Sequence, residues 1–177
     1  AVRQPALRAL QDELHGSLYE SVQRLQQTIG RVRNLVTLEE SDLEPVNLNE
    51  LLTDALHQYD AQLRARKIDA RLETEALPTV TCRPRQMLAV FSGLVSNALA
   101  AVEDGGTIRL TARRNGRGIE VELHDNGRGI PADQLAHIFN PGFTVTGARV
   151  GARNWGLFTA RQIVLGHGGD ISIQSTP

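Results

Sequence analysis

The segment 125–130 constrains the fold more than any other part of the sequence. It reads Asp-Asn-Gly-Arg-Gly-Ile and follows an alternating run, 119–124, that predicts a β-strand. A carboxylate held at the end of a strand can accept a hydrogen bond from an exocyclic amine. Gly127 and Gly129 carry no Cβ, so the backbone there can pack closely against a flat ring. Taken alone, Asp-Asn-Gly is also an ordinary turn sequence, so its meaning depends on the rest of the chain.

Three further segments stand in order around this one. Upstream, the apolar helical run 91–101 contains Asn97. Downstream, 138–144 holds two phenylalanines, and 155–157 reads Trp-Gly-Leu. In this order and spacing the four segments resemble the N, G1, F and G2 boxes of the GHKL ATP-binding fold, in its bacterial sensor histidine kinase branch. The resemblance covers about residues 46–175, and the segment before it also resembles part of such a kinase.

Apolar periodicity and turn residues predict an α+β fold. The expected helices are 48–67, 84–102, a short one after Pro131, and 156–166. The expected strands are 68–73, 79–82, 107–113, 119–124 and 171–174. Helices on one face of a mixed sheet make a two-layer α/β sandwich, and the resemblance implies the GHKL (Bergerat) type. Residues 140–154 show no period and predict a mobile loop.

An α-helical hairpin is expected before this domain. Apolar residues follow a heptad spacing of 4, 3, 4, 3, 4 at Leu18, Val22, Leu25, Ile29, Val32 and Val36. We interpret 1–40 as a partial dimerisation hairpin that pairs with a second copy in a four-helix bundle; the alternative is a hairpin packed on its own domain. Residues 41–46 predict a linker, and 47–177 the ATP-binding catalytic domain.

The resemblance implies ATP and Mg²⁺ as ligands. The asparagine that matches Asn97 coordinates Mg²⁺ in the family. On the same helix face Gly93, Ala100 and Ala101 are small, which leaves room for a hydrated ion with oxygen ligands. The alternative is an asparagine that bonds only locally.

Asp125 is implied to bind the adenine amine, which distinguishes adenine from guanine. The residues implied to complete the nucleotide site are Gly127, Gly129, Ile130, Phe139, Phe143, Gly156 and Leu157. The first three would surround the base, and the phenylalanines would anchor the loop or simply pack in the core. The helix that begins at Gly156 would direct its N–H groups at phosphate.

Two positions depart from the family pattern. Gly93 stands where these kinases usually have a second asparagine, and where related gyrase-type ATPases have a glutamate that activates water. The last box usually reads Gly-x-Gly-x-Gly-Leu, but 152–157 reads Ala-Arg-Asn-Trp-Gly-Leu. Arg149 or Arg153 could supply charge to phosphate instead, or lie in solvent.

The reaction implied is transfer of the ATP γ-phosphoryl to a histidine and then to an aspartate on a response-regulator receiver domain. The family's acceptor motif is His-Glu-Leu-Arg-x-Pro. Arg3 and Pro5 fit its last residues, so the histidine would fall just before Ala1. His15 is a second candidate, because Glu-Leu-His resembles the acceptor motif of another kinase subgroup; it is the weaker one, because that subgroup has Asp where Gly16 stands. The rival hypotheses are a degenerate, non-catalytic adaptor or dimerisation module with weak or no ATP binding, and an ATPase switch.

Composition excludes several classes. The net charge of −1 predicts no nucleic-acid partner. No apolar run approaches the ~20 residues that span a bilayer, so we expect no membrane contact by this segment. The expected location is the cytoplasm, either as a cytosolic protein or as the cytoplasmic part of a membrane-bound sensor. Lys67 is the only lysine and lies outside any Gly-rich motif, which excludes a P-loop.

Overall fold

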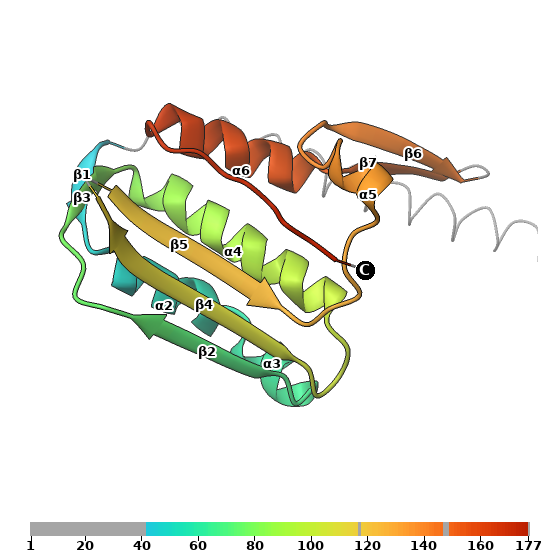
Figure 1. The fold of residues 1–177 in the computed structure, drawn as a ribbon, viewed down its shortest axis with the longest axis horizontal. Coiled ribbons are helices and arrows are strands. Elements are labelled where there is room, and N and C mark those ends of the chain that lie inside the picture. The colour runs from blue at the N-terminus through green and yellow to red at the C-terminus, as the bar shows by residue number, and fades with distance from the viewer. Residues whose placement is uncertain (1–41, 117, 147–148, 177) are drawn as a thin grey trace, which may run out of the picture. The chain divides into compact units, whose positions relative to one another are not determined.

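The computed structural model describes residues 42–116, 118–146 and 149–176 (Figure 1). They form a main body, 42–142 and 154–176, and a separate hairpin of β6 (Gly142–Thr146) and β7 (Arg149–Arg153). The segment predicted as a loop, 140–154, is therefore largely a β-hairpin, in which β6 and β7 pair in a two-stranded sheet. The helical hairpin predicted for 1–40, with its heptad and His15, lies outside the described residues.

The main sheet has the strand order β2-β4-β5, formed by β2 (Asp69–Thr74), β4 (Thr107–Asn115) and β5 (Gly118–Asp125). β2 runs parallel to β4, and β4 antiparallel to β5. Alternate residues of β4 are buried, so one face of the sheet is apolar and the other polar. The register therefore directs Asp125, opposite the buried Ile108, toward the helical side.

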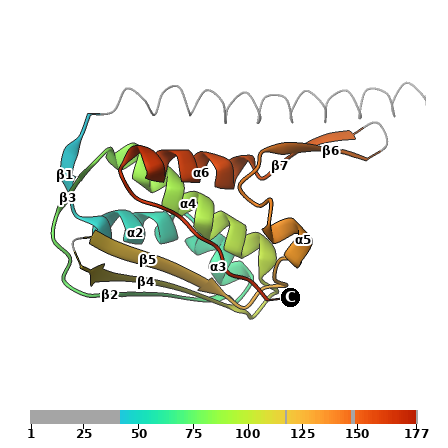
Figure 2. The ribbon, with the colours of Figure 1, turned by 45° about the horizontal axis from the view of Figure 1, so that its top comes forward.

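The helices of the described residues lie on the apolar face of the sheet (Figure 2). α2 (Leu48–His57) packs on β2, and α4 (Pro84–Ala101) packs on β5 and on α2. α6 (Trp155–Gly166) packs in turn on α4. The largest side chains that are fully buried are Leu52, Val90, Val95, Ile108 and Leu110. This arrangement confirms the predicted α+β sandwich of helices on one face of a mixed sheet.

The helix predicted over 48–67 is two helices. α2 ends at His57 and α3 (Asp60–Ala65) begins after Tyr59. The break turns Tyr59 toward α4, where its hydroxyl donates to Ser92 O at 3.1 Å. A tertiary hydrogen bond thus accompanies an interruption that apolar spacing alone does not predict.

The ends of the domain also differ in detail from expectation. Residues 44–46 of the predicted linker form β1 (Glu44–Val46), which pairs antiparallel with β3 (Val80–Cys82). Burial raises the pKa of the Cys82 thiol, and the charge of Glu44 adds to the effect. Residues 171–176 form no strand, although 171–174 were predicted as one. No helix among the described residues is both long and apolar enough to span a bilayer.

His167 fastens α6 to the start of α4. Its Nε2 accepts a hydrogen bond from Arg83 N at 3.0 Å, and its Nδ1 lies 2.7 Å from Ile163 O. His167 therefore has a structural role between these two helices.

Candidate functional site

The Asp125 turn, residues 125–130, follows the end of β5. Gly127 N donates to Asp125 Oδ1 at 2.9 Å, so one carboxylate oxygen holds the turn. Asp125 is exposed to solvent, and both oxygens of a carboxylate can accept hydrogen bonds. The turn therefore leaves Asp125 able to accept a further hydrogen bond from a ligand.

The turn is attached to the carboxyl end of α4. Arg128 N donates to Ala101 O at 3.2 Å. A Cβ on Gly127 would lie 2.7 Å from the carbonyl carbon and oxygen of Ala101, and Gly129 has a φ of +68°. The two glycines thus serve different purposes: Gly127 permits close approach to α4, and Gly129 permits a left-handed backbone.

Two polar residues that sequence reasoning missed also hold the Asp125 turn. Asn126 Oδ1 accepts from Thr107 N at 2.7 Å, which ties the turn to the start of β4. Ser175 Oγ accepts from Ile130 N at 2.9 Å. Asparagine in a turn is a recognisable signal, whereas nothing local marks Ser175.

Asn97 lies on α4 one turn before Ala101, and its residue is exposed. One turn earlier still, a Cβ built on Gly93 would meet no atom within 4 Å. This face of α4 therefore carries an accessible amide oxygen beside open space. Both properties suit a hydrated cation that prefers oxygen ligands, so the residues present fit Mg²⁺.

At the amino end of α6 the space beside the backbone is also open. A Cβ on Gly156 would meet no atom within 4 Å, whereas Leu157 is half-buried. Asn154 precedes the helix with a φ of +62°. It stands where the family motif has its second glycine, and asparagine accepts this conformation at less cost than most residues. The left-handed backbone is thus retained although the glycine is absent.

Three contacts hold the segment that leads to the β6–β7 hairpin. Asn154 Nδ2 donates to His137 O at 3.1 Å, and Trp155 Nε1 donates to Gly142 O at 3.2 Å. The Phe139 ring is half-buried, with the Arg161 guanidinium carbon 4.9 Å from its centroid. Phe139 therefore packs against α6, as an anchor of this segment would.

The remaining predicted residues of the site lie in the β6–β7 hairpin. Phe143 belongs to β6, and Arg149 and Arg153 are the ends of β7. Their proposed contacts with a nucleotide stay predictions.

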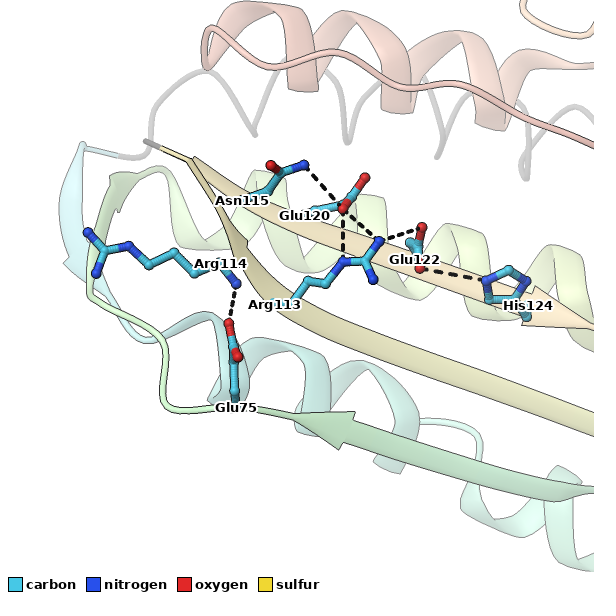
Figure 3. Close-up of polar contacts among 7 residues, drawn as sticks. All are labelled: Glu75, Arg113, Arg114, Asn115, Glu120, Glu122 and His124. Atoms are coloured by element: carbon cyan, nitrogen blue, oxygen red, sulfur yellow. Dashed lines mark hydrogen bonds and ion pairs between the residues drawn. The ribbon is translucent and has the colours of Figure 1, made fainter.

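The outer face of the sheet carries a network of ion pairs (Figure 3). Arg113 Nη2 lies 3.0 Å from Glu120 and 3.4 Å from Glu122, and His124 Nε2 lies 3.7 Å from Glu122. The hydrogen bond that Arg113 donates to Glu120 raises the pKa of Arg113, and the negative charge of Glu122 raises it further. Arg113, Glu120 and Glu122 thus pair with one another on the face opposite the helices.

Gly127→Ala is expected to destabilise the protein by about 1–3 kcal/mol, because the new Cβ would collide with backbone atoms of α4. The matched variant Gly93→Ala is expected to stabilise it by about 0.5–1 kcal/mol, since its Cβ enters open space in a helix interior. Urea unfolding of both variants measures the difference. Equal unfolding midpoints would contradict the proposed contact between Gly127 and Ala101.

Asn154→Gly is expected to be more stable than Asn154→Ala by about 1 kcal/mol. Both variants lose the hydrogen bond to His137, so they differ only in the strain of a Cβ at positive φ. Thermal unfolding of the pair provides the measurement. A more stable alanine variant would show that Asn154 does not adopt the left-handed conformation.

Comparison with known proteins agrees with this geometry. Residues 82–177 match the family described as histidine kinase-, DNA gyrase B-, and HSP90-like ATPase. The sensor histidine kinase ZraS of Escherichia coli (strain K12) is 32% identical over 153 residues, which cover 86% of this chain and 32% of ZraS. The alginate biosynthesis sensor protein KinB of Pseudomonas aeruginosa is 34% identical over 141 residues, which cover 79% of this chain and 24% of KinB.

A solved structure shares the fold. The catalytic domain of histidine kinase ThkA, in a nucleotide-free form, superposes with a TM-score of 0.63 at 26% identity, over 71% of this chain and 82% of that one. The chain spans about a third or less of the curated relatives above. The matched family, the sensor kinase relatives and the shared fold agree with the resemblance seen in the four boxes. The chain therefore belongs to the histidine kinase-, DNA gyrase B- and HSP90-like ATPase family and carries a GHKL catalytic domain of the bacterial sensor histidine kinase type.

Proposed function

We propose that this domain binds Mg-ATP and transfers the γ-phosphoryl group to a histidine, for relay to a response-regulator aspartate. The observation that carries the proposal is the attachment of the Asp125 turn to the end of α4, one turn after Asn97. A base-recognising carboxylate and a cation-binding amide are thereby held on one rigid support. Phosphoryl transfer depends mainly on such positioning and on charge neutralisation, so it requires no side-chain nucleophile in this domain.

The residues have separate roles in this proposal. Asp125 accepts from the adenine amine, while Gly127, Gly129 and Ile130 shape the pocket around the base. Asn97 holds Mg²⁺, which would neutralise phosphate charge. The open amino end of α6 at Gly156 offers N–H groups to phosphate.

In this proposal two phenylalanines would anchor the segment that folds over the nucleotide. Phe139 anchors the segment that leads to the hairpin, and Phe143 lies within the hairpin itself. Arg149 or Arg153 would add positive charge there. Leu157 would seat the first turn of α6.

The rest of the relay lies outside the described residues. The heptad of residues 18–36 supports a homodimer built through the 1–40 hairpin. The phosphoacceptor would be the histidine that precedes Ala1 in the family motif, with His15 as the second candidate. The named relatives are sensor proteins, which supports a cytoplasmic catalytic domain that serves a receiver domain.

Calorimetric titration with a non-hydrolysable ATP analogue, with and without Mg²⁺, tests the first half of the proposal. Trp155 is the only tryptophan and donates to Gly142 O at the base of the hairpin, so its fluorescence gives a second readout. Mg²⁺-dependent binding supports the kinase. Absence of binding in both assays would overturn it in favour of the non-catalytic adaptor.

Incubation of the full-length protein with γ-labelled ATP tests the second half. The expected product carries an acid-labile, alkali-stable label, as a phosphohistidine does. Release of free phosphate without a labelled protein would instead indicate an ATPase switch.

A further inference from the structure

Arg66 lies at the end of α3 and binds a part of the chain that is distant in sequence. Its Nη1 donates to Leu99 O and its Nη2 to Val102 O, both at 2.5 Å. Its Nε donates to the carboxylate of Asp104 at 2.7 Å. Its own carbonyl accepts from Gly105 N at 2.9 Å. One residue thus binds the segment 99–105 with both its side chain and its backbone.

The guanidinium acts as a cap for the carboxyl end of α4. The last carbonyls of a helix have no partner within the helix, and a cation there is favoured by the helix dipole. The planar fork of arginine reaches two of these carbonyls and the Asp104 carboxylate from separate nitrogens, a geometry that the single ammonium of a lysine does not reproduce. Only a third of the Arg66 side chain is exposed (33%), so water competes weakly for its donors.

The segment that Arg66 holds is the one to which the Asp125 turn is attached. Arg128 N donates to Ala101 O, between the two carbonyls that Arg66 binds. On the other side of the turn, Asn126 bonds Thr107, which follows the 104–106 turn directly. Displacement of the 99–106 segment would therefore move both supports of Asp125.

We propose that Arg66 is a positioning residue for base selection: it fixes the end of α4 so that Asp125 meets the amine of adenine. The inference rests on the proposed function, because it assigns Arg66 a share in the specificity of the same site. Arg66 touches no ligand in this scheme. It acts through Ala101 and the Asp125 turn.

The test compares ADP with IDP, whose base carries a carbonyl in place of the 6-amino group. In the wild-type chain ADP should bind more tightly than IDP, because Asp125 can accept from an amine and not from a carbonyl. Arg66→Ala is expected to lower the ratio of ADP to IDP affinity by about tenfold. Arg66→Lys, which keeps the charge and fewer hydrogen bonds, should give an intermediate ratio.

The matched control is Arg64→Ala on the same helix. Arg64 is exposed and pairs only at 3.5 Å with Asp60 among the interactions described for it, so its removal should leave the ratio unchanged. A merely structural Arg66 would lower the unfolding temperature of the alanine variant without changing the ratio. That result, measured well below the unfolding temperature, would overturn the inference.

Amide hydrogen exchange separates this inference from the proposed function. If the wild-type chain binds neither nucleotide, the proposed function fails and the role in base selection fails with it. Faster exchange at the Arg128 amide in Arg66→Ala than in Arg64→Ala would then show that Arg66 still holds the Asp125 turn in place, although no nucleotide binds there. If the chain binds ADP but exchange at Arg128 is equal in both variants, the positioning mechanism itself is wrong.

Discussion

Asp125→Asn is expected to weaken binding of a non-hydrolysable ATP analogue by about a hundredfold while the domain remains folded. The amide oxygen of asparagine can still accept from Gly127 N, so the turn persists. The second carboxylate oxygen, however, becomes an NH₂ group. A donor then faces the donor amine of adenine, and the site loses a charge-assisted hydrogen bond.

The control for this variant is Asp54→Asn, which makes the same change of charge at an exposed position on α2. Calorimetry measures the affinity of both variants, and circular dichroism confirms that both are folded. Equal affinities for the analogue would remove Asp125 from the site. Tighter binding of an inosine nucleotide by Asp125→Asn than by the parent would strongly support the role of Asp125 in base recognition.

Asn97→Ala is expected to eliminate the dependence of nucleotide binding on Mg²⁺ and to lower phosphoryl transfer by at least about a hundredfold. The amide oxygen is the ligand that we assign to the cation, and alanine offers none. The fold should persist, because Asn97 is exposed and alanine has the higher helix propensity. Titration with and without Mg²⁺ and labelling with γ-labelled ATP provide the two measurements.

Ser96→Ala serves as the matched control, since Ser96 is the preceding exposed residue on the same helix. Its Mg²⁺ dependence should equal that of the parent. Persistence of Mg²⁺-dependent binding in Asn97→Ala would assign the cation to other residues. The amino end of α6 would then be the next part of the site to test.

The altered last box, residues 152–157, changes the backbone conformation less than the loss of two glycines suggests. Two of its three usual glycines are replaced, yet Asn154 retains the left-handed conformation and Gly156 retains an open surface. Asparagine adopts positive φ at less cost than most residues, and here its Nδ2 also donates to His137 O, 17 residues away in the sequence. The expected difference between the Asn154 variants tests this compensation directly.

The sequence by itself determined what depends on local pattern. Alternation in β4 and β5 predicts the sheet and the face that it buries, and the Asp-Asn-Gly turn predicts the place of Asp125. Asn47, three residues before Glu50, predicts the start of α2, where Asn47 Oδ1 accepts from Asn49 N. Each of these features is set by hydrogen bonds or side-chain periodicity over a few residues, so neighbours in the chain suffice to reveal it.

Only the tertiary structure decided the contacts between distant segments. The break after His57, the bond from Ile130 to Ser175 and the different purposes of Gly127 and Gly129 all depend on what lies opposite them. Arg66 is the clearest case, because as an isolated arginine at a helix end it resembles its exposed neighbour Arg64. Its partners lie 33 to 38 residues away and come together only when α4 packs against the sheet. Burial and long-range hydrogen bonding therefore assign its role, and no local pattern records them.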